Sequence, residues 1–147
     1  THEQSCGHAA TGYAKSSGKP GISIVTSGPG LTNSITPLTD ATNDSVPFIV
    51  FSGQVPLASM GTNAFQECPS VDIMKSCSKK SIQINSIKDI SYIIDESFYI
   101  ATDGKPGPVH IDCPKDIMSE EIYSDKLNNI KDKDSNKLIN IIKWAGD

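Results

Sequence analysis

Residues 22–30 read Ile-Ser-Ile-Val-Thr-Ser-Gly-Pro-Gly, a short apolar run that ends in a turn of glycine and proline. The β-branched run from Ile22 to Val25 has turn signals on both sides, which predicts a strand buried on both faces. Pro29 and Gly30 then start a helix that we expect to run to about residue 43, because proline is favoured in a first helical turn. Such a strand, turn and helix is typical of α/β folds, which place ligands at these turns.

The segments on either side repeat this alternation. A further buried strand is predicted at 47–52, and two more strands are predicted at 81–84 and 109–112. Helices are predicted at 3–17, 69–76 and 86–102, the last with its apolar stripe at Ile87, Ile90, Ile94, Phe98 and Ala101. A loop over 53–65 leaves the carboxyl end of a strand, where loops often carry function. The sequence therefore predicts an α/β fold with a parallel sheet flanked by helices.

The domain organisation is predicted from composition. We expect one domain over 1–117, a solvated linker over 118–136 that is dense in Asn, Asp and Lys, and the start of a further domain at 137–147. The chain opens at Thr1 and runs directly into a helix that no strand precedes. We therefore expect an internal fragment of a longer polypeptide, whose first domain is incomplete at its N-terminus.

Charge and hydropathy exclude several classes of function. The 147 residues carry a formal net charge of −4, which argues against nucleic acid as a partner because backbone binding needs a basic face. No apolar run approaches the roughly 18 residues of a membrane span, so we expect no membrane partner. The four cysteines form no CxxC pair and no metal-ligand spacing with histidine, so reduced thiols and no metal site are expected in this chain.

Four short motifs stand out, and each has an ordinary structural interpretation when it is taken alone. Glu3 lies in the first turn of a helix, where the helix dipole favours a carboxylate. The turn at 28–30 could be a plain connection or half of a dinucleotide fingerprint, although the third glycine of GxGxxG is missing. Residues 61–67, Gly-Thr-Asn-Ala-Phe-Gln-Glu, could supply a core aromatic and a surface amide. Lys105 could be a solvated turn residue.

Together, in this order, the motifs resemble the biosynthetic acetolactate synthases, enzymes that use thiamine diphosphate (thiamine pyrophosphate). Segment 61–67 is the discriminating one, because those enzymes read Gly-Thr-Asp-Ala-Phe-Gln-Glu there, with Asp where this chain has Asn63. The loss of that charge puts any ionic role of the position in doubt. The alternatives are another thiamine-dependent carboligase or decarboxylase, such as a sulfoacetaldehyde acetyltransferase or a catabolic acetolactate synthase, and a non-catalytic binding module.

The resemblance implies roles for the motif residues. Glu3 would be catalytic, hydrogen-bonding N1′ of the cofactor's pyrimidine ring from an apolar, partly desolvated site that raises its pKa. Gln66 would also be catalytic, as a donor to a substrate oxygen. The resemblance assigns cofactor contact to Gly28, Pro29, Gly30 and Asn33, and assigns the substrate channel to Val55, Pro56, Ala64, Phe65 and Gln66. Lys105 would contact FAD where the family usually has Arg, without the bidentate fork of Arg.

The resemblance also implies the setting of the site. The fold would be the pyrimidine-binding module of a thiamine-diphosphate enzyme, which joins pyruvate to pyruvate or 2-ketobutyrate with loss of CO₂ in branched-chain amino acid biosynthesis. Mg²⁺ would be bound by a domain absent here, in a homodimer or dimer of dimers that shares its active site, with a possible small regulatory subunit. The fragment alone would be inactive, and the location would be bacterial cytoplasm or plastid. His8 and His110 are interpreted as structural histidines.

Overall fold

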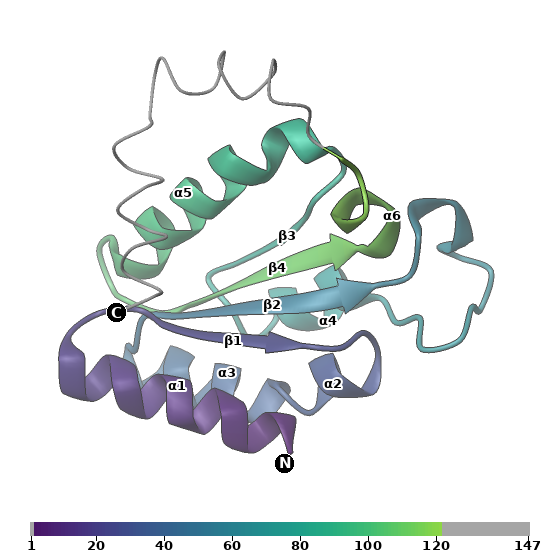
Figure 1. Cartoon of the computed structure of the whole chain (residues 1–147). Coiled ribbons are helices and arrows are strands. Elements are labelled where there is room, and N and C mark those ends of the chain that lie inside the picture. Colours follow the sequence, from purple (N-terminus) through teal and green to yellow (C-terminus); the bar gives the residue numbers. More distant parts are fainter. Residues whose placement is uncertain (1, 122–147) are drawn as a thin grey trace.

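The computed structural model describes residues 2–121, which form a parallel four-stranded sheet with helices on both faces (Figure 1). The strand order is β1-β2-β4-β3, and every pairing is parallel. The strands are β1 (Gly21–Val25), β2 (Phe48–Gln54), β3 (Lys80–Gln83) and β4 (Pro108–Pro114). The predicted fold class is confirmed. Most of the expected linker, and all of 137–147, lie outside the described residues.

The helices and 3₁₀ turns alternate with the strands along the chain. They are α1 (Glu3–Ser17), α2 (Pro29–Thr32), α3 (Ile35–Asp44), η1 (Leu57–Ser59), α4 (Ser70–Lys75), η2 (Ile87–Asp89), α5 (Ile90–Thr102) and α6 (Lys115–Met118). The single helix expected from Pro29 is wrong: it is divided at Asn33 and Ser34, and the Ser34 hydroxyl donates to the Gly30 carbonyl at 3.1 Å. The short helix α6 was not predicted.

Two cores lie on opposite faces of the sheet. The first joins α1, α3 and α4 to the sheet through residues such as Leu38, Phe48 and Val50, and the second joins α5 to the sheet through residues such as Ile49 and Ile111. Successive residues of β2 thus enter different cores, as the two-residue period of a strand requires. Because the first part of β2 faces a core on both sides, residues 48–51 form a continuous apolar run.

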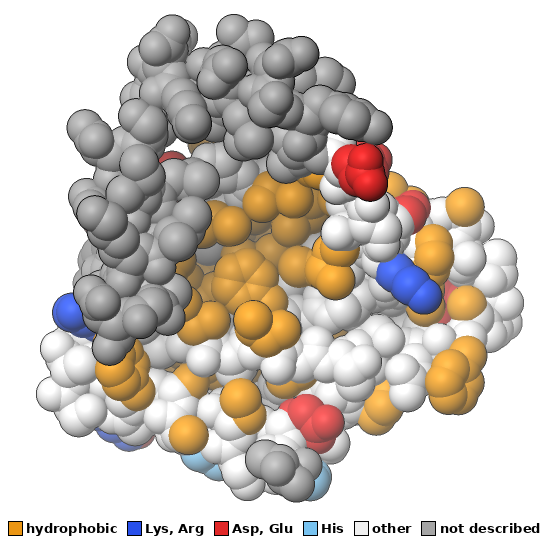
Figure 2. Space-filling view, in the orientation of Figure 1, with side chains coloured by type: hydrophobic (Ala, Val, Ile, Leu, Met, Phe, Trp, Pro, Cys, Tyr) orange, Lys and Arg blue, Asp and Glu red, His pale blue; other side chains and the backbone are white. Residues whose placement is uncertain are grey.

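The strand β1 departs from the prediction that both its faces are buried. Ile24 is 77% exposed, although Val25 belongs to the first core. The physical reason is position: β1 is an edge strand of the described sheet, and α1 packs closely on only one of its faces. Figure 2 shows apolar side chains reaching the molecular surface on the side that bears α5.

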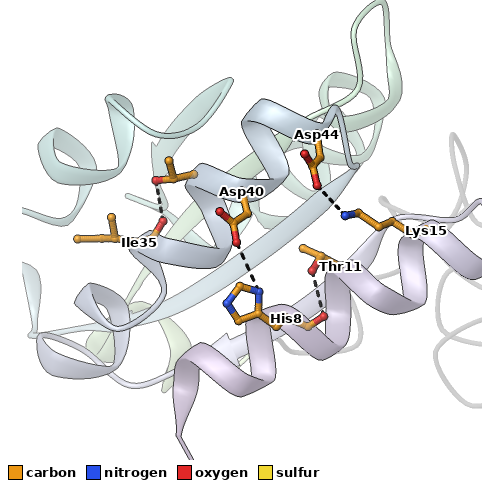
Figure 3. A network of polar contacts seen from close by, with 7 residues as sticks. His8, Thr11, Lys15, Ile35, Asp40 and Asp44 are labelled. Carbon is orange, nitrogen blue, oxygen red and sulfur yellow. Dashed lines mark hydrogen bonds and ion pairs between the residues drawn. The ribbon is translucent and has the colours of Figure 1, made fainter.

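The helices α1 and α3 lie side by side beneath β1 (Figure 1). Gly7 is buried at their contact, where an added Cβ would lie 2.4 Å from Pro37 Cγ. Two exposed contacts link the same helices: His8 Nδ1 lies 3.8 Å from Asp40 Oδ2, and Lys15 forms an ion pair with Asp44 at 2.7 Å (Figure 3). Such exposed pairs contribute at most about 1 kcal/mol, so the close approach at Gly7 fixes this packing more than the charges do. None of the helices within residues 2–121 is long and apolar enough to cross a membrane.

Candidate functional site

The candidate site lies at the edge of the sheet where β1 and β2 have their carboxyl ends. The helix α1 starts there because it runs back toward the amino end of β1, and the Nδ1 atom of His2 caps it by accepting from the Gln4 N–H at 3.2 Å. Glu3 occupies its first turn. Asn33, which ends α2, donates from Nδ2 to Glu3 Oε2 at 3.0 Å. The fold therefore brings together two predicted site residues that are 30 positions apart.

The electrostatic setting of Glu3 differs from the expectation of a raised pKa. Glu3 is half-exposed, and its pKa lies below the ordinary carboxyl value, first because the Asn33 amide donates to it and second because of the helix backbone. Hydrogen bonds to the charged form of a carboxyl favour ionisation, whereas the expected rise requires desolvation. The apolar neighbours in sequence do not supply that desolvation, so the expectation is wrong for residues 2–121.

The turn after β1 has a backbone that another segment of backbone, at Gln66, approaches closely. Gly28 has φ +60°, a left-handed value that favours glycine, and Pro29 and Gly30 begin α2. An added Cβ at Gly28 would lie 2.7 Å from the backbone oxygen of Gln66. A Cβ at Gly30 would lie 2.8 Å from Thr26 Cγ2. The close contact at Gly28 joins the turn to the loop that carries Gln66, across 38 positions of sequence.

The loop at 61–67 has an unusual backbone. Gly61, Asn63 and Gln66 have φ values of +79°, +58° and +62°. Asn is among the residues that tolerate this region best, so the backbone gives Asn63 a conformational role that needs no charge. Phe65 is 89% exposed, and the alternative that it is a core aromatic is wrong for residues 2–121. The loop therefore displays Phe65 and brings the Gln66 backbone against the turn at Gly28.

The other predicted site residues divide between the two edges of the sheet. Val55 is buried and Pro56 is half-buried directly after β2, and Ala64 is half-buried in the loop. These three share the edge that bears Glu3. Lys105 is exposed in the turn before β4, at the amino edge of the sheet, so the structure does not bring it together with the other site residues.

A buried polar network lies behind this edge. His110 is fully buried between two hydroxyls, with Nδ1 2.7 Å from Ser81 Oγ and Nε2 2.8 Å from Ser52 Oγ. Ser52 donates to Asp112 Oδ1 at 2.8 Å, so its oxygen accepts from a protonated Nε2. Burial lowers the pKa of His110 to about 4 and raises the pKa of Asp112. His110 is therefore a neutral structural histidine, as interpreted from the sequence.

The network extends to the end of β2 through the buried side chain of Gln54, a residue for which the sequence predicted no role of its own. Its Nε2 donates to Asp112 Oδ2 at 3.2 Å, to Ser70 Oγ at 2.7 Å and to the Cys68 carbonyl at 3.1 Å. A cavity of about 200 Å³ lies at this end of β2 and β4, and Gln54, Glu67, Cys68 and Asp112 help to line it. The signal for this network was the run of polar residues at alternate positions of adjacent strands, but only the register, Ser52 opposite Asp112, makes them neighbours. No group of three or more metal-ligating side chains gathers within residues 2–121.

Comparison with known proteins agrees with this geometry. Residues 1–76 match the family described as thiamine pyrophosphate enzyme, N-terminal TPP binding domain. The mitochondrial acetolactate synthase catalytic subunit of Saccharomyces cerevisiae is 53% identical over 118 residues, which are 80% of this chain and 17% of that protein. The chloroplastic acetolactate synthase of Arabidopsis thaliana is 52% identical over 119 residues, 81% of this chain and 18% of its own.

The large subunit of acetolactate synthase from Lactococcus lactis is 51% identical over 121 residues, 82% of this chain and 21% of that subunit. The chain thus aligns with about a fifth of the length of these relatives. The family match covers the helix of Glu3, the turn at Gly28 and the loop at 61–67. The chain belongs to the thiamine pyrophosphate enzymes and contains sequence of their N-terminal TPP-binding domain.

Proposed function

We propose that the full-length protein is an acetolactate synthase catalytic subunit, which condenses pyruvate with pyruvate or 2-ketobutyrate and releases CO₂ in branched-chain amino acid biosynthesis. The observation that carries the proposal is the meeting of three segments at one sheet edge. Asn33 donates a hydrogen bond to Glu3. The Gly28 turn contacts the backbone of the loop that carries Gln66 and the exposed side chain of Phe65. Relatives named acetolactate synthase, at about 50% identity, support the reaction class.

The residues present fit one half of a thiamine diphosphate site. When bound, that cofactor supplies a nucleophilic carbon and an electron sink for decarboxylation. Glu3 offers a carboxylate oriented by the amide of Asn33 at 3.0 Å, suited to exchange a proton with a ring nitrogen. The absence of a side chain at Gly28 lets the Gln66 backbone oxygen approach the turn, which brings the 61–67 loop to the same side of the sheet as Glu3. No group of three or more His, Cys, Asp or Glu side chains gathers within residues 2–121, and we propose that a separate domain binds Mg²⁺.

The second half of the site would come from another subunit. The pKa of Glu3 is lowered here, so the carboxyl is ionised near neutral pH; removal of water from it would raise the pKa and let it share a proton. We therefore propose that a partner subunit covers Glu3 and the exposed ring of Phe65, in a homodimer or dimer of dimers with a shared active site. We propose in addition that a small regulatory subunit binds the full-length protein and that the protein is located in bacterial cytoplasm or in a plastid.

The substrate would lie between the turn and the loop. Gln66 would donate an amide hydrogen to a ketoacid oxygen as charge develops there, and Val55, Pro56, Ala64 and Phe65 would form the wall of the channel. Lys105 would contact FAD from the opposite edge of the sheet, so it would take no part in the proton transfers at Glu3. Residues 1–147 alone would have no activity.

Product analysis of the purified full-length protein tests the proposal. Pyruvate and 2-ketobutyrate are supplied with thiamine diphosphate, Mg²⁺ and FAD, and the 2-aceto-2-hydroxy acids are quantified for the wild type, Gln66→Ala and the control Asn43→Ala, which removes an exposed amide from α3. We expect both condensation products from the wild type and from Asn43→Ala, and a rate about 10² lower in Gln66→Ala, the loss typical of one transition-state donor. Acetaldehyde as the main product, or no conversion of pyruvate, would refute the assignment.

A further inference from the structure

We propose that Glu67 is a positioning residue, whose carboxylate holds the 61–67 loop in the shape that brings Gln66 against the turn at Gly28. The expected effect of Glu67 on catalysis rests on the proposed function. Its expected effect on the shape of the loop rests only on the hydrogen bonds and close contacts of the loop. No role for Glu67 follows from the resemblance or from the names of the relatives.

The two carboxylate oxygens of Glu67 bind two different backbone N–H groups of its own loop. Oε1 accepts a short hydrogen bond from the Gly61 N–H, and Oε2 accepts from the Ala64 N–H at 2.9 Å. The backbone N–H of Glu67 returns a hydrogen bond to the Ala64 carbonyl at 3.0 Å. These donors lower the pKa of Glu67, so the group stays ionised and its hydrogen bonds are charge-assisted.

The loop needs such a restraint because its backbone is intrinsically unfavourable. Asn63 and Gln66 are non-glycine residues with positive φ, and positive φ in residues with a Cβ persists only where the surroundings impose it. Thr62 adds one further tie, from its hydroxyl to the Ser59 carbonyl at 2.7 Å. The carboxylate of Glu67 spans the loop from Gly61 to Ala64. It therefore fixes the segment that precedes Phe65 and Gln66.

The backbone next to Glu67 is anchored to the sheet. The Gln54 amide, at the end of β2, donates to the Cys68 carbonyl and to the Ser70 hydroxyl, while its own oxygen accepts from the Val55 N–H at 2.9 Å. The backbone beside Glu67 is thus held in place, and the Glu67 side chain extends from it toward the preceding residues of the loop. On the other side, the Gln66 carbonyl lies against Gly28, with no room for a Cβ between them. The Glu67 carboxylate therefore links the segment anchored to the sheet with the part of the loop that carries Gln66, the residue that would contact the substrate.

The test compares Glu67→Gln, Glu67→Asp and the control Glu120→Gln in the full-length protein. Glu120 is exposed after α6, and its substitution removes the same charge with the same change of atoms. Peptide-resolved hydrogen exchange over residues 59–68 reads the loop directly, and steady-state kinetics of ketoacid condensation reads the consequence. Gln has one acceptor oxygen in place of two, and Asp keeps the charge with a shorter reach.

We expect exchange over 59–68 to be about tenfold faster or more in Glu67→Gln, since charge-assisted hydrogen bonds are lost, and unchanged in Glu120→Gln. Condensation should slow about tenfold or more, with the affinity for thiamine diphosphate little changed and with Glu67→Asp intermediate in both readouts. Exchange as slow in Glu67→Gln as in the control would overturn the proposal. Faster exchange with unimpaired condensation would overturn the positioning role. A wild type that forms no condensation product would refute the proposed function instead, while the exchange comparison would still decide whether Glu67 holds the loop.

Discussion

At the scale of single residues, the candidate site depends as much on missing side chains as on reactive ones. Gly28 combines a left-handed backbone, φ +60°, with a backbone oxygen that would lie 2.7 Å from any Cβ. Gly104 has a nearly equal φ of +58° but open space around its missing Cβ. Comparison of the two glycines therefore tests whether a side chain at Gly28 costs more than positive φ alone, through its ψ of −107° and its close approach to Gln66.

We expect Gly104→Ala to lower the free energy of unfolding by about 1–2 kcal/mol, the cost of positive φ for a residue with a Cβ. Gly28→Ala should cost more than that and should also displace Gln66, so that ketoacid condensation falls while Gly104→Ala retains it. Thermal unfolding and steady-state kinetics of the two variants of the full-length protein check this. Equal losses of stability, with condensation intact in both, would contradict the contact between turn and loop.

The sequence was sufficient to place Glu3 and Gly28 at the same edge, because a helix before a strand and a turn after it must meet there. It was not sufficient to predict the pKa of Glu3. That direction depends on Asn33, which reaches Glu3 only once α2 has folded, and on whatever covers the carboxyl from outside residues 2–121. Likewise, the residue type alone did not decide whether the Phe65 side chain is buried in the core or exposed at the surface.

At the scale of elements, the packing of α1 on α3 depends on a glycine at the contact. We expect Gly7→Ala to destabilise the protein by about 1–3 kcal/mol, because its Cβ would lie 2.4 Å from Pro37 Cγ and the helices would have to separate. Gly12 lies on the same helix with open space around it, so Gly12→Ala should stabilise by up to about 1 kcal/mol through helix propensity. Chemical denaturation of both variants measures the difference, and similar signs for both would count against this packing.

The network that links β2, β3 and β4 makes a second prediction, on pH. His110 has a pKa of about 4 in the folded chain and about 6.5 when unfolded, so the unfolded state binds more protons between these values. Its contribution to stability is complete above pH 6.5 and is lost as the pH falls toward 4, about 2 kcal/mol of it between pH 7 and 5. The raised pKa of Asp112 acts in the opposite direction and reduces the net loss.

We therefore expect the midpoint of thermal unfolding to fall between pH 7 and 5, and to fall less in His110→Gln, in which the titrating group is gone. The control is His8→Gln, because His8 is exposed on α1 and pairs only at the surface with Asp40. Its pH dependence should match that of the wild type. A His110→Gln variant with the full wild-type slope would show that another group titrates in this range.

The elements themselves were predicted where the pattern is strong, in α1, β2 and the parallel pairing of neighbouring strands. The order β1-β2-β4-β3 was not predicted, because every strand carries an apolar run and nothing local distinguishes their neighbours. The break between α2 and α3 was missed for a similar reason. The helical pattern continues across Asn33 and Ser34, and the Ser34 side chain bonds the Gly30 carbonyl only in the folded backbone.

At the scale of the whole molecule, one edge of the described domain carries the residues of the half-site that we propose. Glu3, the Gly28 turn and the 61–67 loop converge there, whereas Phe65 is 89% exposed and Ile24 on the neighbouring edge strand is 77% exposed. The chain aligns with about a fifth of the length of its curated relatives. We therefore propose dimerisation, Mg²⁺ binding by a separate domain and FAD binding only for the full-length protein.

The most direct test of the central claim, that Glu3 acts on the cofactor, is the rate of acetolactate formation by the full-length protein and its Glu3→Gln variant. Thiamine diphosphate, Mg²⁺ and FAD are saturating, Glu120→Gln is the matched control, and circular dichroism confirms folding. We expect a rate lower by about 10² or more in Glu3→Gln, the loss expected for a removed general acid–base group, with the control at the wild-type rate. A folded Glu3→Gln variant that forms acetolactate at the wild-type rate would contradict a role of Glu3 in activating the cofactor.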